Sequence, residues 1–252
     1  MGKGFLTVLS MLAISFAANA KTYMHISLTN EVVDDYVTDS LSKLSLEDQD
    51  STLKLESKNG SIIEYPTDSV ELIMFCEESN GHEFVDLGLS VFWGTMNVGA
   101  ESPEASGNEY QWGKLNPYEG GDMSGAYVSD SILEVDYDIA GTKHDVARAE
   151  WGEQWQMPTL DEWNELLDNC TFIWKTYNNV EGVVAKSNIN GNWIFLPACG
   201  SNINIRWYYR LTKNIEASFA SYWSSTPYID GHLFDRPSIY SYCFYMNNAE
   251  ED

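Results

Sequence analysis

The stretch WGEQWQMPTLDEWNELL, residues 151–167, brings together the residue types that could do chemistry on a sugar. Two carboxylates about 5–9.5 Å apart across a glycosidic bond can hydrolyse it, and flat aromatic rings bind the C–H faces of sugars. The stretch therefore raises three hypotheses: a glycosidase site, a sugar-binding surface, or packing that only builds the core. Its candidates, with the preceding residue included, are Trp151, Trp155, Trp163, Glu150, Glu153, Asp161, Glu162 and Glu165.

Carboxylates alone do not indicate catalysis in this chain, because 38 acidic residues make some close pair inevitable. No zinc-protease, nucleophile-elbow, phosphate-loop or dinucleotide-binding motif occurs. The acidic stretches 136–138 and 230–235 could coordinate calcium, but neither has the full EF-hand pattern, and we interpret both as solvated loops. We therefore expect no metal, no cofactor and no catalytic residue, and a hydrolase is the least favoured function. The histidines are too scattered in sequence to suggest a ligand set: His25, His82, His144 and His232.

Two predicted helices position the 151–167 stretch. Residues 144–152, HDVARAEWG, predict a helix with Asp145 as its N-cap. Residues 159–169, TLDEWNELLDN, begin with a capping box formed by Thr159 and Glu162. The apolar residues of this second helix recur every three or four positions, so they share a face that we expect in the core rather than on a sugar-binding surface. They are Leu160, Trp163, Leu166, Leu167 and Cys170.

Residues 21–78 contain an internal repeat. Residues 24–46 align without a gap with residues 53–75, and the identical positions include Tyr36 and Tyr65. Each copy predicts a strand, an Asn-centred turn, a second strand, a TDS turn and a third strand. One copy buries too little to fold alone, so we expect the two to pack as one small antiparallel sheet unit. We interpret this unit as a spacer or docking module without chemistry.

Residues 1–20 predict an export signal. Lys3 precedes an apolar run, and ANA ending at Ala20 is a cleavage site, so the mature chain would begin at Lys21. We expect an exported protein in the periplasm, at the cell surface or outside the cell, with no membrane insertion after cleavage. A net charge of −24 excludes a nucleic-acid surface and argues against docking on anionic lipid.

The cysteines leave the redox state open. An exported chain permits disulfides, and the wide spacing matches no zinc pattern. Two of the four cysteines end apolar runs, where buried free thiols are as compatible with the sequence as bridges. The four are Cys76, Cys170, Cys199 and Cys243.

The composition changes after residues 76–83, CEESNGHE, which we interpret as a polar linker. All nine tryptophans lie beyond residue 92, in a second region of residues 82–252. Strand-like runs recur there between Asn, Gly and Pro residues. These runs cover residues 84–94, 171–177, 182–187, 192–200, 221–226 and 239–246.

Residues 82–246 resemble the Fibrobacter-type major paralogous domain, a family of exported proteins from gut and oral bacteria. The resemblance rests on the ordered motifs HEFVDLGLSVFWGTMNVG, DVARAEWGEQWQMPTLDEWNELL, IFLPACG and SYWSST. It implies an α+β fold, with a C-type-lectin-like domain of two helices and a curled antiparallel sheet over 82–252, preceded by a small all-β repeat region. It also implies packing roles for Trp151, Trp155 and Trp223, and no reaction.

Two features depart from the family. The chain lacks the Arg-rich closing strand with a VRPV-like motif, so an oligomer or a partner strand could complete the sheet. It also lacks the E-P-N or Q-P-D triplet and the W-N-D motif of calcium-dependent lectins. The resemblance therefore does not imply calcium-dependent sugar binding.

The strongest local binding signal is NINIRWYYRL, residues 202–211. Aromatic and Arg side chains are enriched at binding hot spots, although a strand would bury alternate residues of the same run. Our first hypothesis is an exported, non-catalytic binding module that presents a loop surface to a glycan or surface protein. The alternative is a structural or tip subunit of a bacterial surface assembly. The predicted ligand-binding residues are Arg206, Trp207, Tyr208 and Arg210.

Overall fold

The protein is strand-rich, with two α-helices among the residues described by the computed structural model, in agreement with the predicted α+β class. The predicted signal peptide, residues 1–20, lies outside the described residues. In the described part, no helix is both long and apolar enough to cross a membrane. The structure describes residues 22–30, 32–47, 51–117, 135–198, 219–230 and 238–247.

The two copies of the repeat fold into the same series of elements. Each copy runs strand, Asn turn, strand, 3-10 turn, strand. The Asn30 Oδ1 atom accepts a hydrogen bond from the amide of Val32 at 3.3 Å, and Asn59 Oδ1 accepts from Ser61 at 2.9 Å. The elements are β1 (Thr22–Leu28), β2 (Val33–Val37), η2 (Thr38–Ser40) and β3 (Leu41–Glu47), then β4 (Thr52–Ser57), β5 (Ile62–Pro66), η3 (Thr67–Ser69) and β6 (Val70–Ser79).

The repeat region forms two facing sheets, not the single sheet unit expected from the sequence. The last strand of each copy joins the sheet of the other copy, which gives one sheet in the order β3-β4-β5 and a second that contains β2-β1-β6. Alternate residues of a strand point to opposite faces, so each sheet buries one apolar face against the other. That core contains Met24, Ile26, Leu53, Leu55 and Tyr65.

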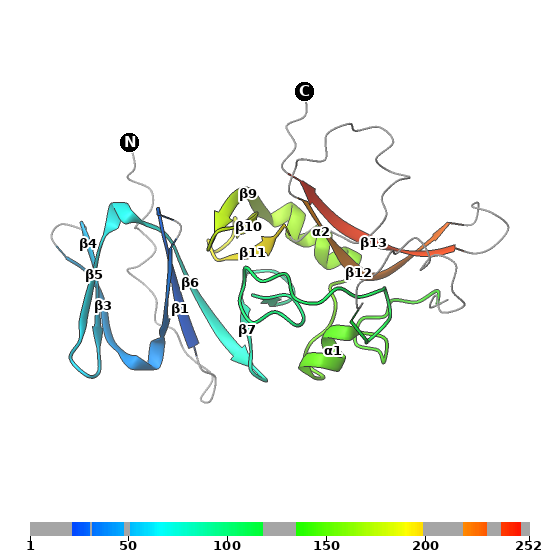
Figure 1. Ribbon diagram of the computed structural model, residues 1–252, viewed down its shortest axis with the longest axis horizontal. Helices are drawn as coiled ribbons and strands as arrows, with labels where there is room; N and C mark the ends of the chain where they lie inside the picture. Colours follow the sequence, from blue (N-terminus) through cyan, green and yellow to red (C-terminus); the bar gives the residue numbers. More distant parts are fainter. Residues whose placement is uncertain are drawn as a thin grey trace, which may run out of the picture.

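The predicted linker over 76–83 is wrong, because these residues continue the sheet. They form the end of β6, a tight turn, and β7 (His82–Val85), which pairs with β6. The turn residues Asn80 and Gly81 have φ angles of 55° and 83°, the left-handed values that a two-residue hairpin requires. With β8 (Trp93–Gly94) the sheet has the order β2-β1-β6-β7-β8. Figure 1 shows β6 extending from the repeat region toward β7 and the second region.

Both predicted helices of the second region are present. Asp145 caps α1 (Val146–Trp151) and accepts a hydrogen bond from the amide of Arg148. The predicted capping box, Thr159 with Glu162, begins α2 (Leu160–Asn169). Trp163 and Leu166 are buried as expected, whereas Leu167 is 46% exposed. The apolar stripe is therefore narrower than the sequence indicated.

The remaining strands cover α2 and complete the core of the second region. One sheet has the order β11-β10-β9, and a two-stranded sheet pairs β12 with β13. The core joins α2 to these strands through Trp163, Val184, Phe195 and Phe244, and it includes Cys76 of the first sheet. The strands are β9 (Cys170–Tyr177), β10 (Val180–Ser187), β11 (Trp193–Pro197), β12 (Phe219–Asp230) and β13 (Ser238–Asn247).

Candidate functional site

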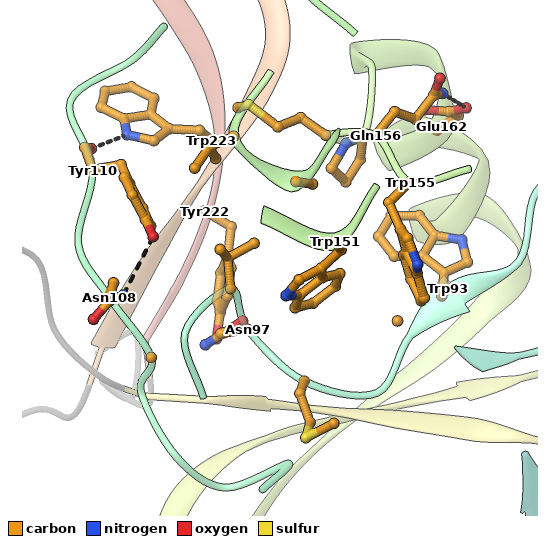
Figure 2. Close-up of a pocket in the computed structure, with 18 of the residues that line it drawn as sticks. Trp93, Asn97, Asn108, Tyr110, Trp151, Trp155, Gln156, Glu162, Tyr222 and Trp223 are labelled. Atoms are coloured by element: carbon orange, nitrogen blue, oxygen red, sulfur yellow. Dashed lines mark hydrogen bonds between the residues drawn. The ribbon is translucent and has the colours of Figure 1, made fainter. Parts of the chain in front are cut away.

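A pocket of about 1020 Å³ lies in the second region, between the chain after β8, the end of α1, the start of α2 and strand β12. Its described walls are rich in aromatic side chains. Figure 2 shows Trp151 near the middle, with other aromatic and amide side chains around it. The aromatic lining residues are Phe84, Phe92, Trp93, Tyr110, Trp112, Trp151, Trp155, Trp163, Tyr222 and Trp223.

Two tryptophans from the 151–167 stretch form one side of the pocket. Trp151 ends α1, and the following turn brings Trp155 edge-on to it, with ring centroids 4.8 Å apart. The ring of His82 stacks on Trp151 at 4.4 Å. Gly94 faces both indoles, because a Cβ atom there would lie 3.2 Å from Trp155 and 3.3 Å from Trp151. A larger residue at Gly94 would therefore displace the two rings.

The β6–β7 hairpin supports these tryptophans from behind. The Asn80 side chain donates to the backbone carbonyl of Trp151. The Trp155 indole N–H donates to the carbonyl of Ser79 at 3.4 Å, and the Ser79 hydroxyl donates to Gln154 at 2.7 Å. The segment 76–83, which the sequence predicted to be a linker, thus holds one wall of the pocket in place.

The opposite wall is fastened to β12 by indole hydrogen bonds. Trp223 donates to the carbonyl of Tyr110 at 2.9 Å, and Trp112 donates to the carbonyl of Ser224 at 2.9 Å. Asn108 donates to the Tyr110 hydroxyl at 3.3 Å (Figure 2). Buried indole N–H groups usually find such partners, and here the partners fix the course of the chain after β8.

Hydrogen bonds to Asp145 fix the segment of chain around α1, which lies between these two walls. Its carboxylate is fully buried and accepts hydrogen bonds from the amides of Gly141 at 2.7 Å, Arg148 at 3.1 Å and Met157 at 3.0 Å. A buried carboxylate with several amide donors is strongly held, because each lost bond would leave a buried polar group unpaired. The N-cap predicted from sequence therefore also fastens the chain on both sides of α1.

The pocket combines flat apolar surfaces with neutral amide groups. Asn97, Asn108, Gln154 and Gln156 line it, and all but the half-buried Asn97 are exposed. Among the described lining residues the charged side chains are three carboxylates and one cation: Glu78, Glu109, Glu162 and Lys114.

The carboxylates of the 151–167 stretch do not form a pair in this pocket. Only Glu162 lines it, and its two oxygens accept from the Thr159 amide at 2.7 Å and from the Gln156 side chain at 3.1 Å. Glu165 accepts from the amide of Ser90 at 3.0 Å. The other three are exposed, so the stretch supplies core and pocket walls rather than a pair of carboxylates. They are Glu150, Glu153 and Asp161.

Several predicted candidates fall elsewhere. The predicted ligand-binding residues, Arg206, Trp207, Tyr208 and Arg210, lie outside the described residues. The 136–138 loop is held by hydrogen bonds within the protein, because Asp138 accepts from the Thr226 hydroxyl and from the Ala140 amide.

A second polar cluster lies between the repeat region and the second region, where sequence analysis expected no ligand set. His25 Nδ1 lies 2.6 Å from Asp35 Oδ1, and His25 Nε2 lies 3.0 Å from Cys76 Sγ and 3.1 Å from Glu83 Oε2. Sequence reasoning missed the cluster because its members are up to 58 residues apart. No repeat position connects them either, since His25 lies in the first strand of the first copy and Cys76 in the last strand of the second copy.

The protonation of this cluster follows from its contacts. Burial by itself lowers the pKa of His25, but hydrogen bonds to Asp35, Cys76 and Glu83 outweigh it and raise that pKa to about 12. Burial raises the pKa of the Cys76 thiol to about 11. At neutral pH the cluster therefore holds the imidazolium form of His25 and the neutral thiol form of Cys76.

The described cysteines form no disulfide. Cys76 and Cys170 are buried free thiols, and Cys243 is an exposed free thiol. Cys199 lies outside the described residues.

No protein-family model matches the chain, and no curated protein or solved structure is significantly similar to it.

Proposed function

We propose that the protein is an exported, non-catalytic binding protein whose second region holds a neutral glycan in the aromatic pocket. The observation that carries the proposal is the pocket of about 1020 Å³, which is lined by both indole rings and neutral amides. Ligand pockets typically enclose about 300–1,000 Å³, so there is room for a sizeable ligand such as an oligosaccharide.

The lining has the two features that sugar recognition needs. The half-buried Trp155 and Tyr222 provide flat apolar surfaces for C–H faces, and aromatic rings combine such surfaces with polar edges. Asn108 and Gln154 are exposed and can both donate to and accept from hydroxyl groups. Asn108 already donates to Tyr110 and Gln154 already accepts from Ser79, and each amide keeps further donor and acceptor capacity that sugar hydroxyls can use.

The charges favour a neutral glycan over an acidic one. The described lining contains three carboxylates, Glu78, Glu109 and Glu162, against Lys114. The whole chain carries a net charge of −24, which repels anions at long range. Sugars with carboxylate or sulfate groups are therefore disfavoured.

We further propose that the second region is a C-type-lectin-like domain of the Fibrobacter-type major paralogous family. Support comes from the two capped helices α1 and α2, the short strands that follow them, and the motif tryptophans in the core and pocket. The pocket would then be a ligand surface of this domain that needs no calcium.

The test is a glycan array with the full mature chain, followed by calorimetry on the neutral oligosaccharide that binds best. Trp155→Ala should weaken binding by about 30-fold or more, because an aromatic anchor contributes about 2 kcal/mol. Asn108→Ala should weaken binding by about 5-fold, the loss of one hydrogen bond.

The matched control is Asn164→Ala, which removes an exposed amide of α2 outside the pocket and should leave affinity unchanged. Melting temperatures of all variants separate loss of fold from loss of contact. The proposal fails if no neutral glycan binds, or if Asn108→Ala and Trp155→Ala both bind as the wild type does. A stable oligomer without glycan binding would instead favour the alternative, a subunit of a surface assembly.

A further inference from the structure

We propose that His25, Cys76 and Glu83 form a site for a zinc-class divalent metal ion, with Asp35 orienting the histidine. The three side chains come from β1, β6 and β7, which are neighbouring strands of one sheet. Their donor atoms Nε2, Sγ and Oε2 are 3.0, 3.1 and 3.4 Å apart, so they face a common point.

Strand register makes this convergence a property of the backbone. His25 lies directly opposite Asp35 in the β1–β2 pair. Cys76 lies opposite Tyr23, one diagonal step from His25 on the same face. Glu83 lies opposite Glu78 in the β6–β7 pair, again on the Cys76 face. A rigid sheet thus presents three different donor atoms at one place.

The distances fit a tetrahedral ion. Zinc–ligand bonds of about 2.0–2.3 Å at tetrahedral angles separate the donor atoms by about 3.4–3.6 Å. The present separations would have to open by only about 0.2–0.6 Å. Three protein ligands leave a fourth position for water, and the Glu83 side chain, 19% exposed, is the most solvent-accessible of the three.

Charge and outer contacts also fit a divalent cation. A thiolate, a carboxylate and a neutral imidazole together carry two negative charges, which a divalent ion neutralises in a site where Cys76 is 2% exposed. The Asp35 carboxylate lies 2.6 Å from His25 Nδ1. A carboxylate at the second nitrogen of a metal-bound histidine orients the ring and strengthens its binding.

The same residues also resemble a Cys–His–Asp nucleophile, but three observations oppose that function. Cys76 is almost fully buried, the Glu83 carboxylate lies 3.4 Å from its sulfur, and neither residue lines the described pocket. A neighbouring carboxylate disfavours the thiolate that attack requires, whereas a metal ion needs both groups as ligands.

The test uses the tag-free mature chain, stripped with chelator and titrated with Co²⁺ and then Zn²⁺. One equivalent of Co²⁺ should produce thiolate-to-cobalt charge-transfer absorption, and Zn²⁺ should displace it. X-ray absorption of the zinc-loaded wild type should show one sulfur at about 2.3 Å and nitrogen or oxygen ligands at about 2.0–2.2 Å. Absence of sulfur from the metal shell would overturn the proposal without any variant.

Variants identify the ligands. Cys76→Ser should abolish the charge-transfer absorption, whereas Cys243→Ser, which removes an exposed thiol, should leave it unchanged. Asp35→Asn should weaken metal binding about 10–100-fold. Glu83→Gln removes a less buried ligand and covers the case in which Cys76→Ser does not fold. Absorption that persists in Cys76→Ser, or metal affinity unchanged in Glu83→Gln, would contradict the site.

Discussion

The two regions place their polar groups by different means. In the repeat region, paired strands set the position of each side chain, and the His25 cluster follows from the register of four neighbouring strands. In the second region, the aromatic pocket is built from segments with little regular structure. Caps and side chain–backbone hydrogen bonds hold those segments, as at Asp145 and Trp223.

The difference has a consequence for what each region can do. A sheet positions a few atoms within tenths of an ångström, which suits a metal ion. Loops over a fixed scaffold tolerate variation in sequence, so the lining of the pocket can change without a change in the core. The hairpin of β6 and β7 belongs to both regions, since Glu83 faces the cluster and Asn80 contacts Trp151.

Trp163→Ala should give the largest effect, because it removes the centre of the second region's core. Trp163 is 5% exposed and stacks on Phe244 with ring centroids 4.8 Å apart. Truncating a buried Trp costs about 3–5 kcal/mol of unfolding free energy, measured by denaturant titration. Leu167→Ala on the same helix removes a side chain that is 46% exposed and should cost about 1 kcal/mol or less. Equal costs would mean that α2 does not carry the core.

Some elements of this fold can be predicted from the sequence alone, and others cannot. The repeat, both helices, the Asp145 cap and the capping box of Thr159 carry strong local signals, and the structure contains all of them. Local patterns do not state which strands of a repeat become neighbours, so the two-sheet arrangement was missed. The Asn80–Gly81 hairpin did have a local signal, but its polar flanks favoured the linker interpretation.

The candidate sites were less predictable than the fold. Trp151, Trp155 and Trp163 were recognised as packing residues, yet the pocket that they share with Tyr110 and Trp223 depends on contacts across more than a hundred residues of chain. The same holds for His25, Cys76 and Glu83, which no spacing rule connects. Spatial convergence of distant residues is set by tertiary structure, which a single sequence does not display.

The free energy of unfolding of the metal-free protein should fall as pH rises above 6.5. His25 has a pKa of about 12 in the folded protein against its ordinary value of 6.5, so between these two pH values the folded state holds a proton that the unfolded state has lost. Its stabilisation is fully present below pH 6.5 and is lost as pH rises toward 12, by at most about 1.4 kcal/mol per pH unit. Chemical denaturation at pH 6, 7 and 8.5 measures the slope.

The control for this slope is His25→Gln, which should flatten it. Asp35, Glu83 and Cys76 also face His25. The Cys76 thiol, whose pKa burial raises to about 11 from an ordinary value of 9.0, adds to the slope only toward pH 8.5 and above. If the stability of the variant and of the wild type fell with pH at the same slope, His25 would not be the group that titrates. The view that strand register alone builds a tight cluster would then be weakened.

The smallest effect tests how symmetric the repeat is. Tyr36 and Tyr65 occupy equivalent positions, and their hydroxyl groups are hydrogen-bonded to each other. The Tyr65 hydroxyl also donates to Asp34 at 2.5 Å, so Tyr65→Phe removes two bonds and Tyr36→Phe removes one. We expect Tyr65→Phe to lower the free energy of unfolding by about 2 kcal/mol and Tyr36→Phe by about 1 kcal/mol, because a bond to a charged acceptor contributes more than a neutral one.

Denaturant titration of both single variants and the double variant gives the coupling energy between the two hydroxyl groups. Equal single costs would mean that Asp34 contributes nothing. A double variant that loses the full sum of the single costs would mean that the two hydroxyls do not cooperate, and the repeat would then be held together by its apolar core alone.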